Sequence, residues 1–102
     1  MYLIEFLLPT LDNDGQRFPK DAFDRVRSEL TDRFGGVTAY FRSPAVGLWS
    51  DETGRIHSDE LALIEVMADS LDRAWWRSYR EKLEQQFRQE EVIVRAFAFD
   101  RL

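Results

Sequence analysis

The stretch "FPKDAFDRVRSELTDRFGGVTAYF", Phe18 to Phe41, predicts a helix that ends at a glycine and leads into a strand. Its apolar residues recur at helical spacing, and Pro19 suits the first turn of a helix. Gly35 is the expected helix stop, because a left-handed terminal residue costs glycine little. Val37 to Phe41 is typical of a strand, and Pro44 limits any continuation to a sheet edge, where a missing N–H breaks no ladder.

Outside this stretch the sequence predicts three more strands and a second helix. Tyr2 to Leu8 is an apolar run closed by a proline and the turn sequence DNDG. Arg55 to Ala68 follows a second turn, DETG, and is apolar enough for a strand buried on both sides. A helix capped by Asp69 or Ser70 should follow, and Glu91 to Phe99 is the last predicted strand. The apolar stripe of that helix is Leu71, Trp75, Tyr79, Leu83 and Phe87.

The element order is therefore β-α-β-β-α-β, which indicates an α+β fold. Its usual solution is the ferredoxin-like sandwich, an antiparallel sheet in the order 4-1-3-2 with both helices on one face. A length of 102 residues fits one such domain, which we expect to span residues 1–102.

Composition excludes several classes of function. Fourteen basic against nineteen acidic residues give a net charge of −5, which repels phosphate backbones and anionic lipids, so we expect neither nucleic acid nor membrane as partner. The absence of cysteine rules out disulfides and thiolate sites and is compatible with the cytoplasm, where we expect the protein. With a single histidine, no calcium-loop pattern and no dinucleotide, phosphate-loop or serine-hydrolase motif, we expect no metal and no cofactor.

Alternation along the strands divides the sheet into two faces. One set has no charge and should lie under the helices: Tyr2, Ile4, Phe6, Leu8, Val37, Ala39, Phe41, Ala62, Ile64, Val66, Val92, Val94, Ala96 and Ala98. The other face has no helix left to cover it. Its large apolar residues are Leu3, Leu7, Leu63, Met67, Phe97 and Phe99. Soluble monomers rarely expose an apolar patch beyond roughly 300–600 Å². We therefore expect a homodimer that packs sheet against sheet about a two-fold axis.

The same open face carries four charged residues, Glu5, Arg42, Glu65 and Arg95. In the predicted strand order, Arg95 neighbours Glu5 and Arg42 neighbours Glu65. Two interpretations follow. The residues form cross-strand ion pairs that fix the register, or they line a polar pocket in which an arginine holds an anionic ligand and a carboxylate acts as a base.

Aromatic residues mark two further places. Trp75 and Trp76 point about 100° apart on a helix, so Trp75 shares the apolar stripe while Trp76 lies at its edge, packing on the other helix or lining a pocket. Tyr40, Trp49 and His57 belong to the predicted hairpin, which is either an ordinary exposed hairpin or a cover over the end of a ligand cavity.

The motifs "FGGVTAY", "GLW" and "DETG", with Glu60 after them, resemble a pattern of small uncharacterised bacterial ferredoxin-like proteins. The whole element pattern is more distantly similar to dimeric α/β-barrel proteins, which include small monooxygenases and stress-response modules. This resemblance implies the fold and assigns no catalytic residue. Two functions stay open. The first is a noncatalytic dimeric module that binds a small organic ligand or a protein partner. The second is a cofactor-free enzyme, an oxygenase or isomerase, acting on an aromatic or anionic small molecule.

Overall fold

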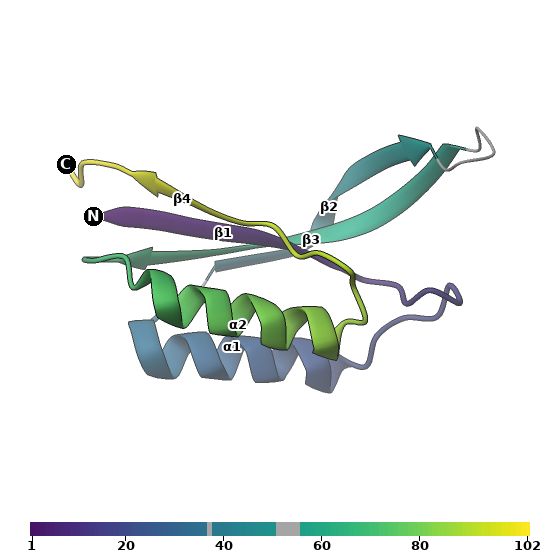
Figure 1. Cartoon of the computed structure of the whole chain (residues 1–102), viewed down its shortest axis with the longest axis horizontal. Coiled ribbons are helices and arrows are strands. Elements are labelled where there is room, and N and C mark those ends of the chain that lie inside the picture. Colours follow the sequence, from purple (N-terminus) through teal and green to yellow (C-terminus); the bar gives the residue numbers. More distant parts are fainter. Residues whose placement is uncertain (37, 51–55) are drawn as a thin grey trace.

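A four-stranded antiparallel sheet is covered on one face by two helices (Figure 1). The computed structural model describes residues 1–36, 38–50 and 56–102, with side chains for 1–36, 38 and 61–102. Its elements are β1 (Tyr2–Pro9), α1 (Lys20–Phe34), β2 (Thr38–Ser50), β3 (Ile56–Ala68), α2 (Arg73–Gln86) and β4 (Val94–Ala98). The strands lie in the order β2-β3-β1-β4, which read from the other edge is 4-1-3-2. The α+β class predicted from the sequence is confirmed.

β2 lies at a sheet edge, where Pro44 predicts it, but it does not end at Phe41. The strand continues to Ser50, and its register against β3 shifts between Tyr40 and Ala45. Proline has no N–H to give to the ladder, so an irregularity around Pro44 lets the pairing resume beyond it. Val37 and the turn DETG lie outside the described residues.

β4 is shorter than predicted, because it begins at Val94 and not at Glu91. The backbone N–H of Val92 donates to the side chain of Glu84 on α2, over 2.9 Å, instead of to a neighbouring strand. At the other end of β4, the N–H of Phe99 donates to the carbonyl oxygen of Met1 over 3.0 Å. This bond holds the two ends of the chain side by side (Figure 1).

The sequence predicts the C-terminus of α1 correctly but not the N-terminus of α2. α1 ends as predicted at Gly35, whose φ is 80° and whose N–H donates to Thr31 O over 2.8 Å. The predicted caps of α2, Asp69 and Ser70, are wrong, because the helix begins only at Arg73 and both residues lie in the bend before it. Asp72 is the N-cap, and its carboxylate accepts from the N–H of Trp75 over 3.1 Å.

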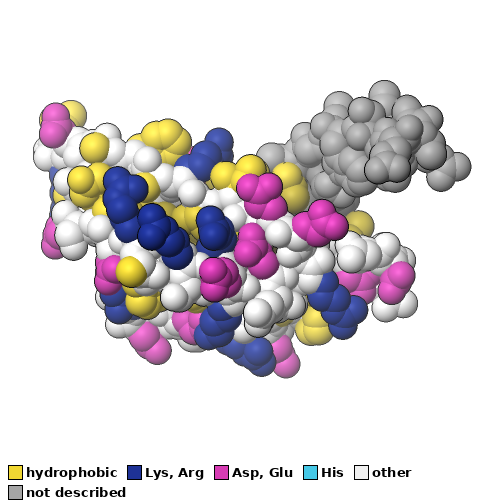
Figure 2. Space-filling model, in the orientation of Figure 1, with side chains coloured by type: hydrophobic (Ala, Val, Ile, Leu, Met, Phe, Trp, Pro, Cys, Tyr) yellow, Lys and Arg dark blue, Asp and Glu magenta, His cyan; other side chains and the backbone are white. Residues whose placement is uncertain are grey.

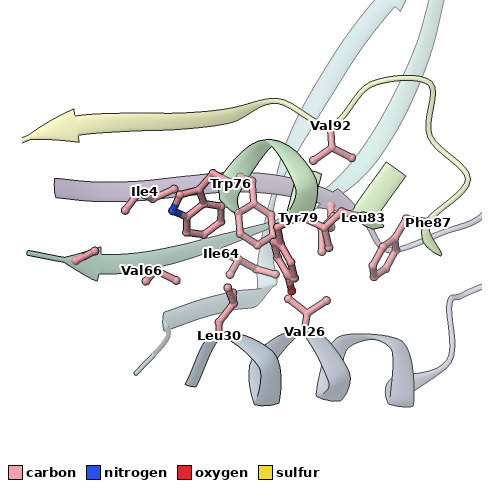
Figure 3. Close-up of a cluster of buried hydrophobic side chains, with 13 residues drawn as sticks. Ile4, Val26, Leu30, Ile64, Val66, Trp76, Tyr79, Leu83, Phe87 and Val92 are labelled. Carbon is pink, nitrogen blue, oxygen red and sulfur yellow. The ribbon is translucent and has the colours of Figure 1, made fainter. Parts of the chain in front are cut away.

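The core lies between the sheet and the helices (Figure 3), and charged side chains cover the outer surface of the helices (Figure 2). Trp75 is half-buried against the core and stacks on Tyr79, as its place in the stripe predicts. Trp76 packs on the other helix as predicted, but it is 5% exposed and therefore more deeply buried than an edge position implies. Trp76 lies three residues before Tyr79 and stacks on Phe34 of α1, with ring centroids 5.4 Å apart. The fully buried side chains of the core are Ile4, Phe6, Leu8, Val26, Leu30, Ala62, Ile64, Val66, Leu83 and Phe87.

The predicted helix-covered face is correct for β1 and β3 but not for β4. Val94 is half-buried, and Ala96 and Ala98 are exposed. This edge strand lies beyond the main cover of α2, so part of its inner face is reached by solvent. The side chains of Ala39 and Phe41 are outside the described set. Within the described part of the chain, no helix has the length and apolar character needed to cross a membrane.

Candidate functional site

The open face of the sheet presents large apolar side chains to solvent. Met67 is 57% exposed, Ile93 58% and Phe97 48%, whereas core residues of the same kind are near zero. Leu3, Leu7, Leu63 and Phe99 are half-buried around them. None of the described elements covers this face (Figure 1). It is the predicted apolar face, and it is accessible to a ligand or to another protein surface.

A row of four polar residues crosses the open face at one level, one from each strand. The register places Thr38 opposite Glu65, Glu65 opposite Glu5, and Glu5 opposite Arg95. We call these four residues the polar row. The guanidinium Nη2 of Arg95 lies 2.7 Å from Oε1 of Glu5, so the predicted contact between these residues is confirmed. The Glu5 side chain is 13% exposed and that of Arg95 51%, so this pair is only partly shielded from water.

The polar row holds two carboxylates and one arginine. Glu5 and Glu65 are direct partners on neighbouring strands, an arrangement of like charges that is unfavourable in a sheet. Arg95 forms an ion pair with one of them, Glu5. Glu65 has no ion pair or hydrogen bond with any side chain that the structure describes. Among the described side chains, none donates to this acceptor.

The prediction that Arg42 lies next to Glu65 is wrong. The register pairs Glu65 with Thr38, and Arg42 falls in the irregular part of β2 between Tyr40 and Ala45. The irregular segment sets where the ladder resumes, so strand order alone does not give the pairing. The side chain of Arg42 is outside the described set.

The hairpin residues do not gather around the polar row. Trp49 pairs with His57, eight residues along β3 from Glu65, which corresponds to about 26 Å of strand. Tyr40 pairs with Leu63 and so lies beside the row in the backbone. The β2–β3 hairpin extends past the helices (Figure 1). The register therefore separates Trp49 and His57 from the other candidate site residues, and the side chains of Tyr40, Trp49 and His57 are not among those described.

A groove of about 920 Å³ opens at the end of the polar row. Thr38 and Glu65 form part of its wall. Other parts come from the C-terminus of α1, the segment before α2, the first residues of the chain and the end of β3, and from Arg101. Arg33 in this wall is already engaged, because its guanidinium lies 3.1 Å from Asp72 and 4.5 Å from the ring centre of Trp75. The groove falls within the size range of small-molecule sites, about 300–1,000 Å³.

Two features of α2 are absent from the site predicted from sequence. Tyr79 is buried, its hydroxyl has no hydrogen-bond partner within the described chain, and burial together with the charge of Glu29 raises the pKa of its phenol. Arg73, Arg77 and Arg80 lie along one side of the helix. Their spacing of four and three residues is visible in the sequence, but a charged helix face is usually only solvated, and the sequence does not show which neighbours are missing. Among the described residues, no group of three or more His, Cys, Asp or Glu side chains is placed to hold a metal ion.

Comparison with known proteins gives a structural likeness without a family. No protein-family profile matches the chain, and no curated protein matches it significantly. A phage SAM lyase in complex with S-methyl-5′-thioadenosine is similar, with a TM-score of 0.62 and 14% identity over 94% of this chain and 79% of that chain. A phage SAM lyase in the apo state gives a TM-score of 0.59 and 14% identity, over 94% and 78%. At this identity the likeness shows a shared fold and no more.

Proposed function

We propose that the chain is a ferredoxin-like, noncatalytic module that dimerises through its open sheet face and binds a small organic ligand beside the polar row. One observation carries the proposal: an uncovered apolar face surrounds a carboxylate, Glu65, that has no described partner. The expectation of a cytoplasmic, bacterial protein belongs to the same proposal and rests on composition and on the resemblance given above.

A second copy is the occupant that best fits the face. A two-fold contact brings the same patch from both chains together, so exposed apolar residues such as Met67 and Phe97 meet apolar residues. The charges also agree. Each copy contributes a half-exposed Arg95 as well as carboxylates, so the contact does not bring only like charges together.

The ligand is expected to carry a hydrogen-bond donor or a positive charge. Glu65 offers acceptor oxygens at the mouth of the groove, and Leu3 and Met67 in the same wall offer apolar contact. A buried or half-buried acceptor is best satisfied by an amine, amide or hydroxyl group. S-methyl-5′-thioadenosine, the compound bound in the similar phage structure, is a suitable first compound to test, because it has hydroxyl and amino donors and an apolar thioether.

Native mass spectrometry of the purified protein tests the proposal. We expect a dimer that carries a co-purifying small molecule or takes up an added one, with binding reduced about tenfold or more by Glu65→Gln. Glu81→Gln is the matched control, because Glu81 is exposed on α2 and is not part of the groove. If Glu65→Gln and Arg95→Met leave every ligand response unchanged, the polar row is not the site.

The cofactor-free enzyme remains the second candidate. It is favoured by the two carboxylates, Glu5 and Glu65, that lie opposite one another beside a groove, since a positioned carboxylate can act as a general base. Incubation followed by mass analysis distinguishes the two candidates. A bound compound of unchanged mass supports the binding module, and a compound converted at a rate that Glu65→Gln lowers supports the enzyme.

A further inference from the structure

A second cavity lies on the other side of the sheet from the polar row, between α2 and β4. Its volume is about 150 Å³, close to that of an engineered cavity known to hold one benzene ring. The wall combines apolar residues with three arginines. It consists of Ile4, Leu71, Trp76, Val94 and Ala96 together with Arg73, Arg77 and Arg80. The exposed inner face of β4, which the sequence predicts as covered, forms one side of this cavity.

The three arginines are not neutralised within the described chain. Arg73, Arg77 and Arg80 lie four and three residues apart, so they share one side of α2, where like charges at this spacing repel. No acidic side chain among those described forms an ion pair with any of them. Glu84, four residues after Arg80, accepts from the N–H of Val92 instead. The chain as a whole has a net charge of −5, yet Figure 2 shows Lys and Arg side chains grouped over α2 and β4.

Two hydrogen-bond donors in the cavity wall are buried without a partner in the described chain. They are Nε1 of Trp76 and Nε of Arg80. Trp76 is 5% exposed, and in Figure 3 its indole nitrogen lies at the end of the ring nearest to Ile4, another wall residue. A buried donor that stays unsatisfied is costly, and native proteins rarely leave two together. The missing group is therefore an acceptor.

From these observations we propose that the cavity binds a small organic anion, with a carboxylate or phosphate head and a ring-sized apolar body. The head oxygens accept from the guanidinium groups of Arg77 and Arg80 and from the indole N–H of Trp76. Such charge-assisted bonds are stronger than neutral ones, and guanidinium groups match both head groups in geometry. The apolar body lies on Ile4 and Val94. This site is separate from the groove beside Glu65, and its occupancy does not depend on dimerisation.

The test is a titration of the ¹⁵N-labelled protein followed by NMR, with the indole N–H signals as reporters. Phenyl phosphate and benzoate serve as probes and distinguish the two head groups, while benzyl alcohol is the uncharged counterpart. A Trp76→Phe variant identifies the Trp76 signal. We expect a saturable shift of that signal with at least one anionic probe, weakened about tenfold by Arg77→Gln. Arg25→Gln on α1 is the matched control for the loss of one positive charge and should leave the affinity unchanged.

Three results would overturn the proposal. The first is the absence of a saturable shift with both anions. The second is equal binding of benzyl alcohol, which would make the cavity merely apolar. The third is equal weakening by Arg77→Gln and Arg25→Gln, which would show nonspecific attraction. Arg77 is exposed, so its substitution is expected to leave the fold intact, and the amide spectrum verifies this. Binding that survives Glu65→Gln separates this site from the proposed function.

Discussion

If the chain forms the proposed dimer, replacing Phe97 by aspartate is expected to shift it towards the monomer. Phe97 is 48% exposed on β4, at the open face. A phenylalanine side chain buries about 150–250 Å² when fully covered, so about 100 Å² per copy remains for a partner to cover. At about 25 cal/mol per Å², covering it contributes up to about 2.5 kcal/mol per copy and about 5 kcal/mol for the two copies of a symmetric contact. Losing half of this free energy, about 2.5 kcal/mol, weakens dimerisation about seventyfold.

Sedimentation equilibrium over a range of micromolar concentrations measures this change. The unaltered chain should give twice the mass of 12.1 kDa, and Phe97→Asp should give the mass of one chain. Leu102→Asp is the matched control, because Leu102 is fully exposed at the chain end and outside the strands. A single-chain mass for the unaltered protein at all concentrations, or a dimer that tolerates Phe97→Asp, would refute the assignment of the open face.

The remaining predictions concern folding stability, measured by urea denaturation. Asp72→Ala removes the cap of α2 and should lower the free energy of unfolding by about 1 kcal/mol, with Asp72→Asn close to the original; equal losses would contradict the capping role. Gly35→Ala should cost about 1–2 kcal/mol, because φ is 80° there, whereas Gly36→Ala, without a positive φ, should cost less. Tyr79→Phe should change stability by no more than about 1 kcal/mol, because the buried hydroxyl makes no hydrogen bond within the described chain although it lies close to the Glu29 carboxylate. The raised pKa of Tyr79 also predicts that stability depends on pH. The unfolded chain loses the phenol proton near the ordinary pKa of 10.0, and the folded chain loses it at higher pH. The free energy of unfolding is therefore unaffected by this group below pH 10 and falls as the pH rises above 10. Tyr79→Phe should remove this part of the slope, and an unchanged slope would exclude Tyr79 as its source.

The sequence predicts correctly those features for which only one backbone conformation or one buried face is possible. Gly35 is one such signal, because few other residues tolerate its backbone angle. The alternation in β1 and β3 is another, since a strand with Ile4, Phe6 and Leu8 on one side can bury only that side under the helices. The charges on the open face follow from the same alternation, and the contact between Arg95 and Glu5 follows from strand order.

Features for which the sequence offers several local conformations of similar energy could not be predicted. Asp69, Ser70 and Asp72 are all able to cap α2, and only the path of the chain after β3 selects Asp72. The facing of Trp75 and Trp76 depends on packing against Phe34, which the helix pattern alone does not contain. The neighbour of Glu65 depends on an irregular segment near Pro44. The arginine cavity required knowing that α2 leaves the inner face of β4 partly open.

The hydrogen bond from Phe99 to Met1 places both ends of the chain at one corner of the sheet. A short glycine-rich linker from residue 102 to residue 1 should therefore close the chain with little strain. New ends could then be opened in the exposed turn at Asn13 and Asp14, far from both proposed sites in sequence. Such a circular permutant would join residues 102 and 1 at this corner and keep the spatial order of the strands.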